Sequence, residues 1–308
     1  MADKYLVGGA VVASLGLAAV GAVYFAPRPV SSPVILVTQP SPVDASSSGK
    51  RPLGPTLPLL PSYIASEQFA VSASLGNSDA NCTLDTGTSL GLAVNPLFAR
   101  YAGGFVNTGT ASIANVGDTA QGWTFVAPVI IGGYTMQVHG LADPAWNGQP
   151  LIGMPLLQAL WPNGFALDTV HLQVRPVTTP YAVPPTYAPT LPLWLAGYRQ
   201  RKELIASVRL GNATTQAVMD TGNEFAAVIS PATAKAAGVR IVAGTPPYSP
   251  AGSQWFEAPV TVYRHTVTVR GVVNPAWSYI PLLGVPFWRT LYPRGWAVNL
   301  VKMRIQPL

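Results

Sequence analysis

The chain has 308 residues, of which 10% are charged and 49% hydrophobic, and its formal net charge is +6 at pH 7. This length accommodates two domains of ordinary size, and the single cysteine, Cys82, excludes an intrachain disulfide. Basic residues are dispersed apart from the group Arg199-Gln200-Arg201-Lys202, which argues against nucleic-acid binding because that function requires a clustered basic face.

Residues 5–26 contain no charged side chain and are rich in Gly, Ala, Val and Leu. At about 1.5 Å per residue, a helix of this length crosses a bilayer. We therefore predict that residues 1–26 are an N-terminal transmembrane anchor and that the remaining chain lies outside the cytoplasm, in the periplasm or extracellular space. Two alternatives stay open. One is a cleaved signal peptide, and the other, with less support because the stretch is apolar all round, is a buried soluble helix.

Two proline-rich segments divide the rest of the chain. Residues 27–61 are rich in Pro and Ser and are expected to form an extended tether, with an inhibitory pro-segment as the alternative. Residues 177–200 contain a second run of prolines and are expected to form a semi-rigid linker. These boundaries leave an N-terminal lobe at 62–176 and a C-terminal lobe at 201–308.

The patterning within the lobes is that of β-strands. Apolar and polar residues alternate over 69–75, 260–263 and 265–269, with the period of two that strands require. The best helix candidate is 230–237, where Ser230 is a suitable N-cap and a proline follows at the first helical position. We therefore predict an all-β fold with few helices.

The tripeptide Asp-Thr-Gly occurs twice, at 85–87 and 220–222, and the copies lie 135 positions apart. Leu-Gly-Asn precedes both copies at the same spacing, at 75–77 and 210–212. Downstream matches at a spacing of 131 are Pro144-Ala145-Trp146 with Pro275-Ala276-Trp277, Leu151-Ile152-Gly153 with Leu282-Leu283-Gly284, and Trp161-Pro162-Asn163-Gly164 with Tyr292-Pro293-Arg294-Gly295. The chain therefore contains a duplicated unit, and we expect two similar lobes that each carry one Asp-Thr-Gly loop.

Paired loops of this kind suggest a shared catalytic site for Asp85 and Asp220. Two carboxylates a few ångströms apart do not both ionise readily, so they share one proton. The ionised partner accepts a proton from a bound water, while the protonated partner donates a hydrogen bond to a substrate carbonyl. This is general acid–base hydrolysis of an amide without a covalent intermediate.

The flanking residues are suited to holding such loops in place. Gly87 and Gly222 are expected to let the backbone turn tightly where each aspartate is presented. Thr86 and Thr221 are expected to form hydrogen bonds across the lobe interface through their hydroxyl groups.

These motifs resemble those of the pepsin-like and retropepsin-like aspartic peptidases. Residues 82–89, Cys-Thr-Leu-Asp-Thr-Gly-Thr-Ser, resemble the family's apolar-Asp-Thr-Gly-Ser/Thr motif. Residues 151–153 and 282–284 resemble its later apolar-apolar-Gly element, which in the family packs beside the catalytic loop. The resemblance covers about 66–308 and leaves the anchor and most of the tether outside.

The resemblance implies a bilobal β-barrel fold with pseudo-two-fold symmetry and a peptide-binding cleft between the lobes, closed by a β-hairpin flap. Segments 108–121 and 243–254 are the two flap candidates. It also implies an aspartic endopeptidase that acts as a monomer, with water as the nucleophile and neither a metal nor an organic cofactor. The three histidines, His139, His171 and His265, are scattered without metal-ligand spacing, in agreement with that expectation.

One loop departs from the family pattern. Thr88 follows Gly87, and its hydroxyl is expected to support the Asp85 carboxylate. Gly222 is followed instead by Asn223, which is still able to donate a hydrogen bond, and then by Glu224. This third carboxylate either raises the apparent pKa values of the pair by repulsion, or faces solvent or pairs with a base such as Arg209.

Two other functions are possible on the sequence. Residues 87–91 fit the G-x-S-x-G nucleophile elbow with Ser89 as nucleophile, but that motif requires a strand–turn–helix context in an α/β sheet. Duplicated lobes also drift into catalytically inactive binding or structural modules, because fold does not determine function. Cys82 is better explained as a small buried apolar residue than as a reactive thiol.

Overall fold

The computed structural model describes residues 54–64, 67–115, 118–144, 146–177, 191–192, 194–196, 203–247 and 249–308. No helix within these ranges is long and apolar enough to cross a membrane. The anchor predicted at 1–26 and most of the predicted tether lie outside the described residues.

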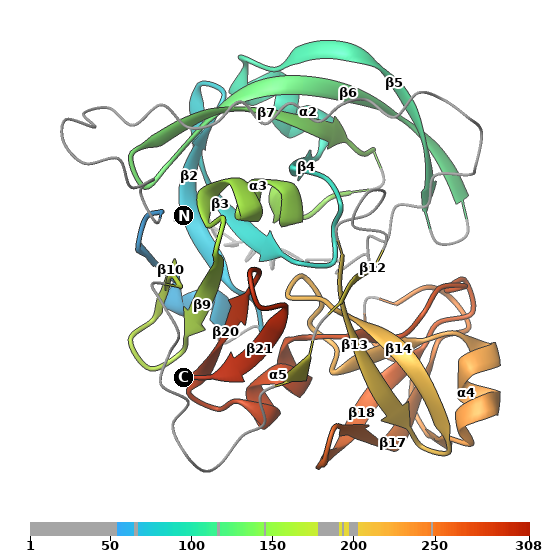
Figure 1. Ribbon diagram of the computed structural model, residues 1–308. Helices are drawn as coiled ribbons and strands as arrows, with labels where there is room; N and C mark the ends of the chain where they lie inside the picture. The colour runs from blue at the N-terminus through green and yellow to red at the C-terminus, as the bar shows by residue number, and fades with distance from the viewer. Residues whose placement is uncertain are drawn as a thin grey trace, which may run out of the picture.

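The N-terminal lobe is built on a seven-stranded sheet that closes into a barrel (Figure 1). The strand order is β2-β3-β8-β4-β7-β6-β5, and a further pairing of β2 with β6 joins six strands into a ring with β5 outside it. The elements are β2 (Ala70–Leu75), β3 (Ser78–Asp85), β4 (Leu92–Val94), α2 (Pro96–Ala102), β5 (Val106–Asn115), β6 (Asp118–Ile131), β7 (Tyr134–Ala142), β8 (Leu151–Gly153) and α3 (Met154–Leu160).

The C-terminal lobe repeats this plan. Its sheet order is β12-β13-β14-β19-β15-β18-β17-β16, and pairing of β13 with β17 closes a second six-stranded ring. The elements are β12 (Trp194–Ala196), β13 (Glu203–Leu210), β14 (Ala213–Met219), β15 (Ala227–Ile229), α4 (Pro231–Ala237), β16 (Arg240–Val242), β17 (Gln254–Val262), β18 (His265–Val273), β19 (Leu282–Leu283) and α5 (Val285–Leu291). The all-β prediction is confirmed, and two closed barrels are consistent with a bilobal pepsin-like fold.

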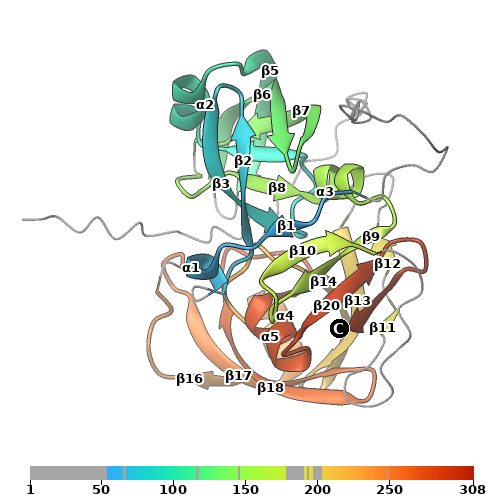
Figure 2. The same ribbon diagram turned by 90° about the vertical axis from the view of Figure 1, so that its left-hand side faces the viewer.

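A third sheet joins the lobes (Figure 2). Its order is β1-β10-β9-β20-β21-β11, so three strands come from each half of the chain and the central pair, β9 with β20, crosses from one half to the other. The elements are β1 (Leu57–Pro58), β9 (Gly164–Asp168), β10 (Gln173–Pro176), β11 (Leu191–Pro192), β20 (Gly295–Asn299) and β21 (Arg304–Pro307), with the short helix α1 (Pro61–Ile64) after β1.

The edge strands of this sheet extend into the segments that the sequence assigned to the tether and the linker. Strand β1 pairs with β10, and β11 pairs with β21. Both edge strands lie in the same five-residue sequence, Pro-Thr-Leu-Pro-Leu, at 55–59 and 189–193. The duplicated unit therefore begins earlier than the Asp-Thr-Gly repeat indicated, and the signal for this was present in the sequence.

The local predictions agree with the structure in most places. Helix α4 begins after Ser230, whose hydroxyl accepts a hydrogen bond from Thr233 N at 3.0 Å. The first flap candidate, 108–121, lies in the hairpin of β5 and β6, which pair as far as Asn115 with Asp118. The second candidate, 243–254, contains no hairpin in its described residues and leads into β17. The two lobes therefore differ in this segment.

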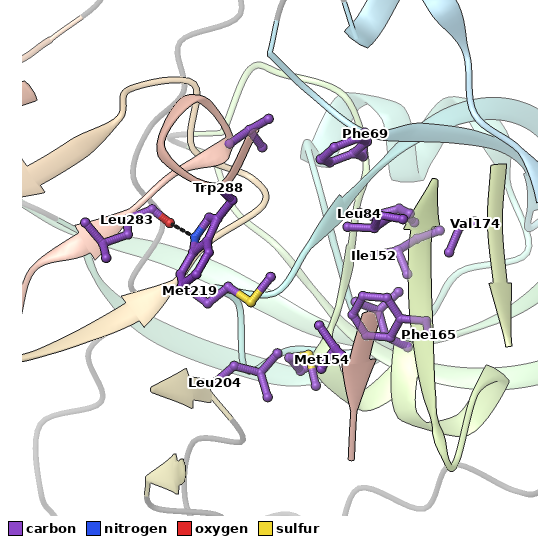
Figure 3. Close-up of a cluster of buried hydrophobic side chains, with 14 of the residues drawn as sticks. Phe69, Leu84, Ile152, Met154, Phe165, Val174, Leu204, Met219, Leu283 and Trp288 are labelled. Atoms are coloured by element: carbon purple, nitrogen blue, oxygen red, sulfur yellow. Dashed lines mark hydrogen bonds between the residues drawn. The ribbon is translucent and has the colours of Figure 1, made fainter. Parts of the chain in front are cut away.

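One continuous hydrophobic core runs through both lobes (Figure 3). From the N-terminal half it includes Phe69 and Leu84, and from the C-terminal half Met219 and Trp288, whose indole N–H donates to the carbonyl of Leu283 at 2.8 Å. Leu84 and Met219 immediately precede the two aspartates. The shared core therefore restricts the positions of both Asp-Thr-Gly loops.

Candidate active site

The two Asp-Thr-Gly loops occupy equivalent positions at the ends of two buried strands. Asp85 is the last residue of β3, and Asp220 follows the end of β14. Beside them run the two apolar-apolar-Gly elements as parallel neighbours, with Asp85 opposite Gly153 and Met219 opposite Leu283. This is the packing that the resemblance implies for these elements.

Two threonines lock the loops to each other across the lobe interface. Thr86 N donates to Thr221 Oγ1 at 3.1 Å, and Thr221 N donates to Thr86 Oγ1 at the same distance. Each hydroxyl in turn donates to the opposite lobe at 2.6 Å, from Thr86 to the carbonyl of Met219 and from Thr221 to that of Leu84. Both threonines are fully buried, so all four bonds are shielded from water.

The glycines are needed for a different reason from the one the sequence suggested. Neither Gly87 nor Gly222 has a positive φ, so a tight turn is not what selects them. A Cβ atom at Gly87 would lie 2.5 Å from Cγ of Asp220, and one at Gly222 would lie 2.5 Å from Cγ of Asp85. Glycine is required because each loop passes directly against the carboxyl group of the other lobe.

The two carboxyl groups are buried together. Asp85 is 5% exposed and Asp220 6%, and their side chains are joined by a hydrogen bond. Burial raises the pKa of Asp85 above its usual range, although the bond from Asp220 and the backbone N–H groups of Gly87, Thr88 and Gly222 partly offset this effect. Two buried carboxyl groups in contact do not both ionise readily, so we expect the pair to share one proton.

Main-chain donors bind one oxygen of each carboxyl group in the same way. Gly87 N donates to Asp85 Oδ1 at 2.8 Å, and Gly222 N donates to Asp220 Oδ1 at 2.9 Å. The backbone N–H of Gly222 also reaches across to Asp85, a contact that no sequence pattern indicated because it involves the main chain of the opposite lobe. Thr88 likewise supports Asp85 through its backbone N–H, where the sequence suggested its hydroxyl.

The prediction that Asn223 takes over the supporting role beside Asp220 is not what the structure shows. The Asn223 side chain is buried, and its Oδ1 accepts a hydrogen bond from Phe225 N at 3.0 Å. Its Nδ2 has no hydrogen-bond partner among the described residues. The amide therefore stabilises the turn after the catalytic loop, because its oxygen is used there and its N–H groups do not reach Asp220.

Glu224 is half-buried and unpaired in the described part of the chain. No hydrogen bond or ion pair within 4.0 Å involves its carboxylate there, and the expected partner Arg209 instead donates from Nε to the carbonyl of Gly211 at 3.2 Å. Burial raises the pKa of Glu224 above its usual value. The expected pairing of Glu224 with Arg209 is therefore not found in the described part of the chain, and its carboxylate is only partly exposed to solvent.

The competing interpretations of neighbouring residues lose support. Ser89 lies between β3 and the short strand β4, so the strand–turn–helix that a nucleophile elbow requires is absent at this position. Cys82 is fully buried, and its burial raises the thiol pKa to about 12, which makes it unreactive. No group of three or more potential metal ligands occurs among the described residues.

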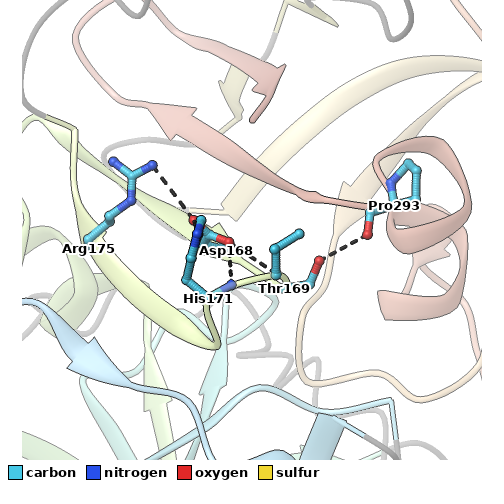
Figure 4. Close-up of polar contacts among 6 residues, drawn as sticks. Asp168, Thr169, His171, Arg175 and Pro293 are labelled. Atoms are coloured by element: carbon cyan, nitrogen blue, oxygen red, sulfur yellow. Dashed lines mark hydrogen bonds and ion pairs between the residues drawn. The ribbon is translucent and has the colours of Figure 1, made fainter.

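His171 belongs to the turn between β9 and β10 (Figure 4). Its Nδ1 lies 2.8 Å from Asp168 Oδ2, and the Arg175 guanidinium lies 3.9 Å from the same oxygen. Burial opposes ionisation of Asp168, but hydrogen bonds and charge from His171 outweigh it and hold the Asp168 pKa below its usual value. The neighbouring hydroxyl of Thr169 donates to the carbonyl of Pro293 at 3.0 Å, so this turn links the two halves of the chain.

Comparison with known proteins does not assign the chain to a family. No family model matches it, and no curated protein matches it in sequence. Among solved structures, basic 7S globulin from soybean matches with a TM-score of 0.45 and 13% identity, over 82% of this chain and 96% of that one. A retropepsin-like aspartic protease from Rickettsia conorii matches with a TM-score of 0.29 and 22% identity, over 39% of this chain and 86% of that one. Likeness at this level assigns no activity.

Proposed function

We propose that the chain is an aspartic endopeptidase that hydrolyses peptide bonds with a water activated between Asp85 and Asp220. The observation that carries this proposal is the pair itself. Two buried carboxyl groups on equivalent loops of two lobes are hydrogen-bonded to each other and braced by the same backbone donors. Buried carboxyl groups without a cation destabilise the folded state. A purely structural role therefore does not explain this pair.

The proton held by the pair defines the chemistry. The ionised carboxylate takes a proton from water as that water attacks the scissile carbonyl carbon, while the protonated carboxyl donates to the carbonyl oxygen as charge develops there. The four threonine bonds between the lobes keep the two groups at fixed separation, as a preorganised site requires. The apparent pKa values belong to the pair rather than to either residue.

The substrate in this proposal is an extended peptide. It lies between the lobes with side chains alternating toward each side, and the β5–β6 hairpin of the N-terminal lobe covers it as the flap. Apolar residues beside the scissile bond, a monomeric enzyme, and attachment to the outer face of a membrane through residues 5–26 complete the proposal. These three features rest on the family resemblance and on the apolar N-terminal stretch.

The test is cleavage of a peptide library by the full chain between about pH 2 and about pH 7. The variants Asp85→Asn and Asp220→Asn are each expected to lose at least ~100-fold in kcat/KM, because general acid–base catalysis contributes about that much or more. A matched control is Asp79→Asn, which removes an exposed carboxylate from the same strand as Asp85. Inactivity of the wild type over the whole range, or full activity of either site variant, would overturn the proposal. Peptide binding without cleavage would favour an inactive binding module.

A further inference from the structure

The two lobes differ systematically on the barrel face beside the catalytic loops. In β14, Val218 points away from the main core while its neighbours Ala217 and Met219 point into it. This second face carries a separate apolar cluster made of Ile205, Val218, Phe225, Val228, Val272, Trp277 and Leu282, with Trp255, Tyr279 and Ile280 partly buried against it. We call Trp255, Tyr279 and Ile280 the apolar rim.

The equivalent face of the N-terminal lobe is much smaller. Its cluster consists of Ala93, Trp146 and Leu151, with Leu90 partly buried against it. At the repeat spacings of 135 and 131, pairs of equivalent residues are Leu90 with Phe225, Ala93 with Val228, Gly148 with Tyr279, and Gln149 with Ile280. Tyr279 and Ile280 of the apolar rim therefore have no large apolar counterpart in the N-terminal lobe, so they are not a general requirement of the fold.

Glu224 is joined to this cluster along the chain. It directly precedes Phe225, whose ring meets that of Trp255 edge-on at 5.7 Å between centroids. The equivalent residue in the other lobe is the neutral Ser89. Because the carboxylate is half-buried and unpaired, and burial is the only effect acting on its pKa, no cation in the described part of the chain compensates for its loss of water.

One ring of this surface already carries a cation. The Arg270 guanidinium lies 4.6 Å from the centroid of Trp255 and forms no ion pair with Glu224 within 4.0 Å. The Trp255 ring thus already accepts a cation–π contact. The Glu224 carboxylate forms no ion pair with any described cation. A long basic side chain packs its alkyl stem on apolar surface and keeps its charged end at a polar group, which is the combination that Glu224 and the apolar rim offer.

We propose that Glu224 and the apolar rim select a lysine or arginine side chain of the substrate on the C-terminal side of the aspartate pair. The inference rests on the proposed peptidase function and adds a substrate class to it. The basic side chain lays its stem against Trp255, Tyr279 or Ile280 and places its charge at the Glu224 carboxylate. Pairing with a cation restores the interaction that burial removes from Glu224.

The test compares peptides that differ only in lysine or norleucine, placed in turn at each position around the scissile bond. At one position the full chain is expected to prefer lysine by about 5- to 20-fold in kcat/KM, the range for a partly shielded charged pair. Glu224→Gln is expected to bring that ratio to about one, and Glu224→Asp to retain part of it. The control Glu257→Gln removes another carboxylate of the same lobe, one that pairs with Arg240, and leaves the ratio unchanged.

Two outcomes overturn the inference while leaving the peptidase proposal standing: cleavage with no preference for lysine at any position, and a preference that persists in Glu224→Gln. Absence of any cleavage overturns the peptidase proposal instead. In that case the affinities of the full chain for the lysine and norleucine peptides decide the inference, because selection through Glu224 predicts tighter binding of the lysine peptide and its loss in Glu224→Gln.

Discussion

The hydrogen bonds that Thr86 and Thr221 form between the lobes give the sharpest stability prediction. Replacing Thr86 by valine keeps the shape of the side chain but removes the hydroxyl that donates to the Met219 carbonyl and accepts from Thr221 N. Both backbone groups then stay buried without a partner. Each buried unsatisfied group costs about 1–3 kcal/mol, so Thr86→Val should lower the free energy of unfolding by about 2–6 kcal/mol. This is a large share of the roughly 5–15 kcal/mol that stabilises an ordinary domain.

The repeat supplies an internal control for this prediction. Thr221→Val removes the bonds to the Leu84 carbonyl and from Thr86 N, at the same distances, so it should cost about the same as Thr86→Val. Thr86→Ser keeps the hydroxyl and should cost much less than Thr86→Val. Urea unfolding followed by tryptophan fluorescence measures all three. The reasoning is refuted if Thr86→Val costs less than about 0.5 kcal/mol, or if valine and serine at this position are equivalent.

Two further predictions follow from other contacts. Gly87→Ala should abolish peptide cleavage, measured by kcat/KM, and lower the unfolding temperature, because the new Cβ would lie 2.5 Å from Cγ of Asp220; normal activity would show that close approach is not what selects glycine there. Asp168→Asn should preserve the turn, since the equivalent residue Asn299 accepts the same backbone bonds. Asp168→Asn should also make the free energy of unfolding fall less steeply as the pH is lowered. The folded-state pKa of Asp168 is lowered, so its contribution is present above the unfolded value of about 3.9 and is lost as pH falls through the folded value. Thermal melts at a series of pH values measure this. The same decrease in unfolding temperature at low pH for the wild type and Asp168→Asn would contradict the prediction.

Much of the arrangement of the candidate site was already determined by the sequence. The repeat of Asp-Thr-Gly identified two equivalent loops, and the family resemblance predicted an apolar-apolar-Gly element beside each of them. That each loop lies at the end of a buried strand came from the structure. The capped helix at 231–237 was equally evident, because an N-cap serine and a first-turn proline act within a few residues of each other. These features depend on local spacing, which a single sequence records completely.

Other features required the tertiary structure. The role of Gly87 depends on the carboxyl group of Asp220, which lies far away in the chain, and the same holds for the backbone N–H of Gly222 that reaches Asp85. Two further features depend on where every neighbouring side chain lies. One is the use of the Asn223 amide in its own turn, and the other is that no described cation pairs with Glu224.

The features that the sequence determines differ from those that only the structure decides for one physical reason. Residue type and spacing determine which backbone conformations and which paired motifs are favourable, so the sequence determined that two similar lobes would each present an aspartate. Burial, hydrogen-bond partners and the protonation of a carboxyl group depend on distances through space between residues far apart in the chain. Only the packing of the two barrels against each other therefore decided that the aspartates share a hydrogen bond, that glycine must lie opposite each of them, and that Glu224 has no partner among the residues that the structure describes.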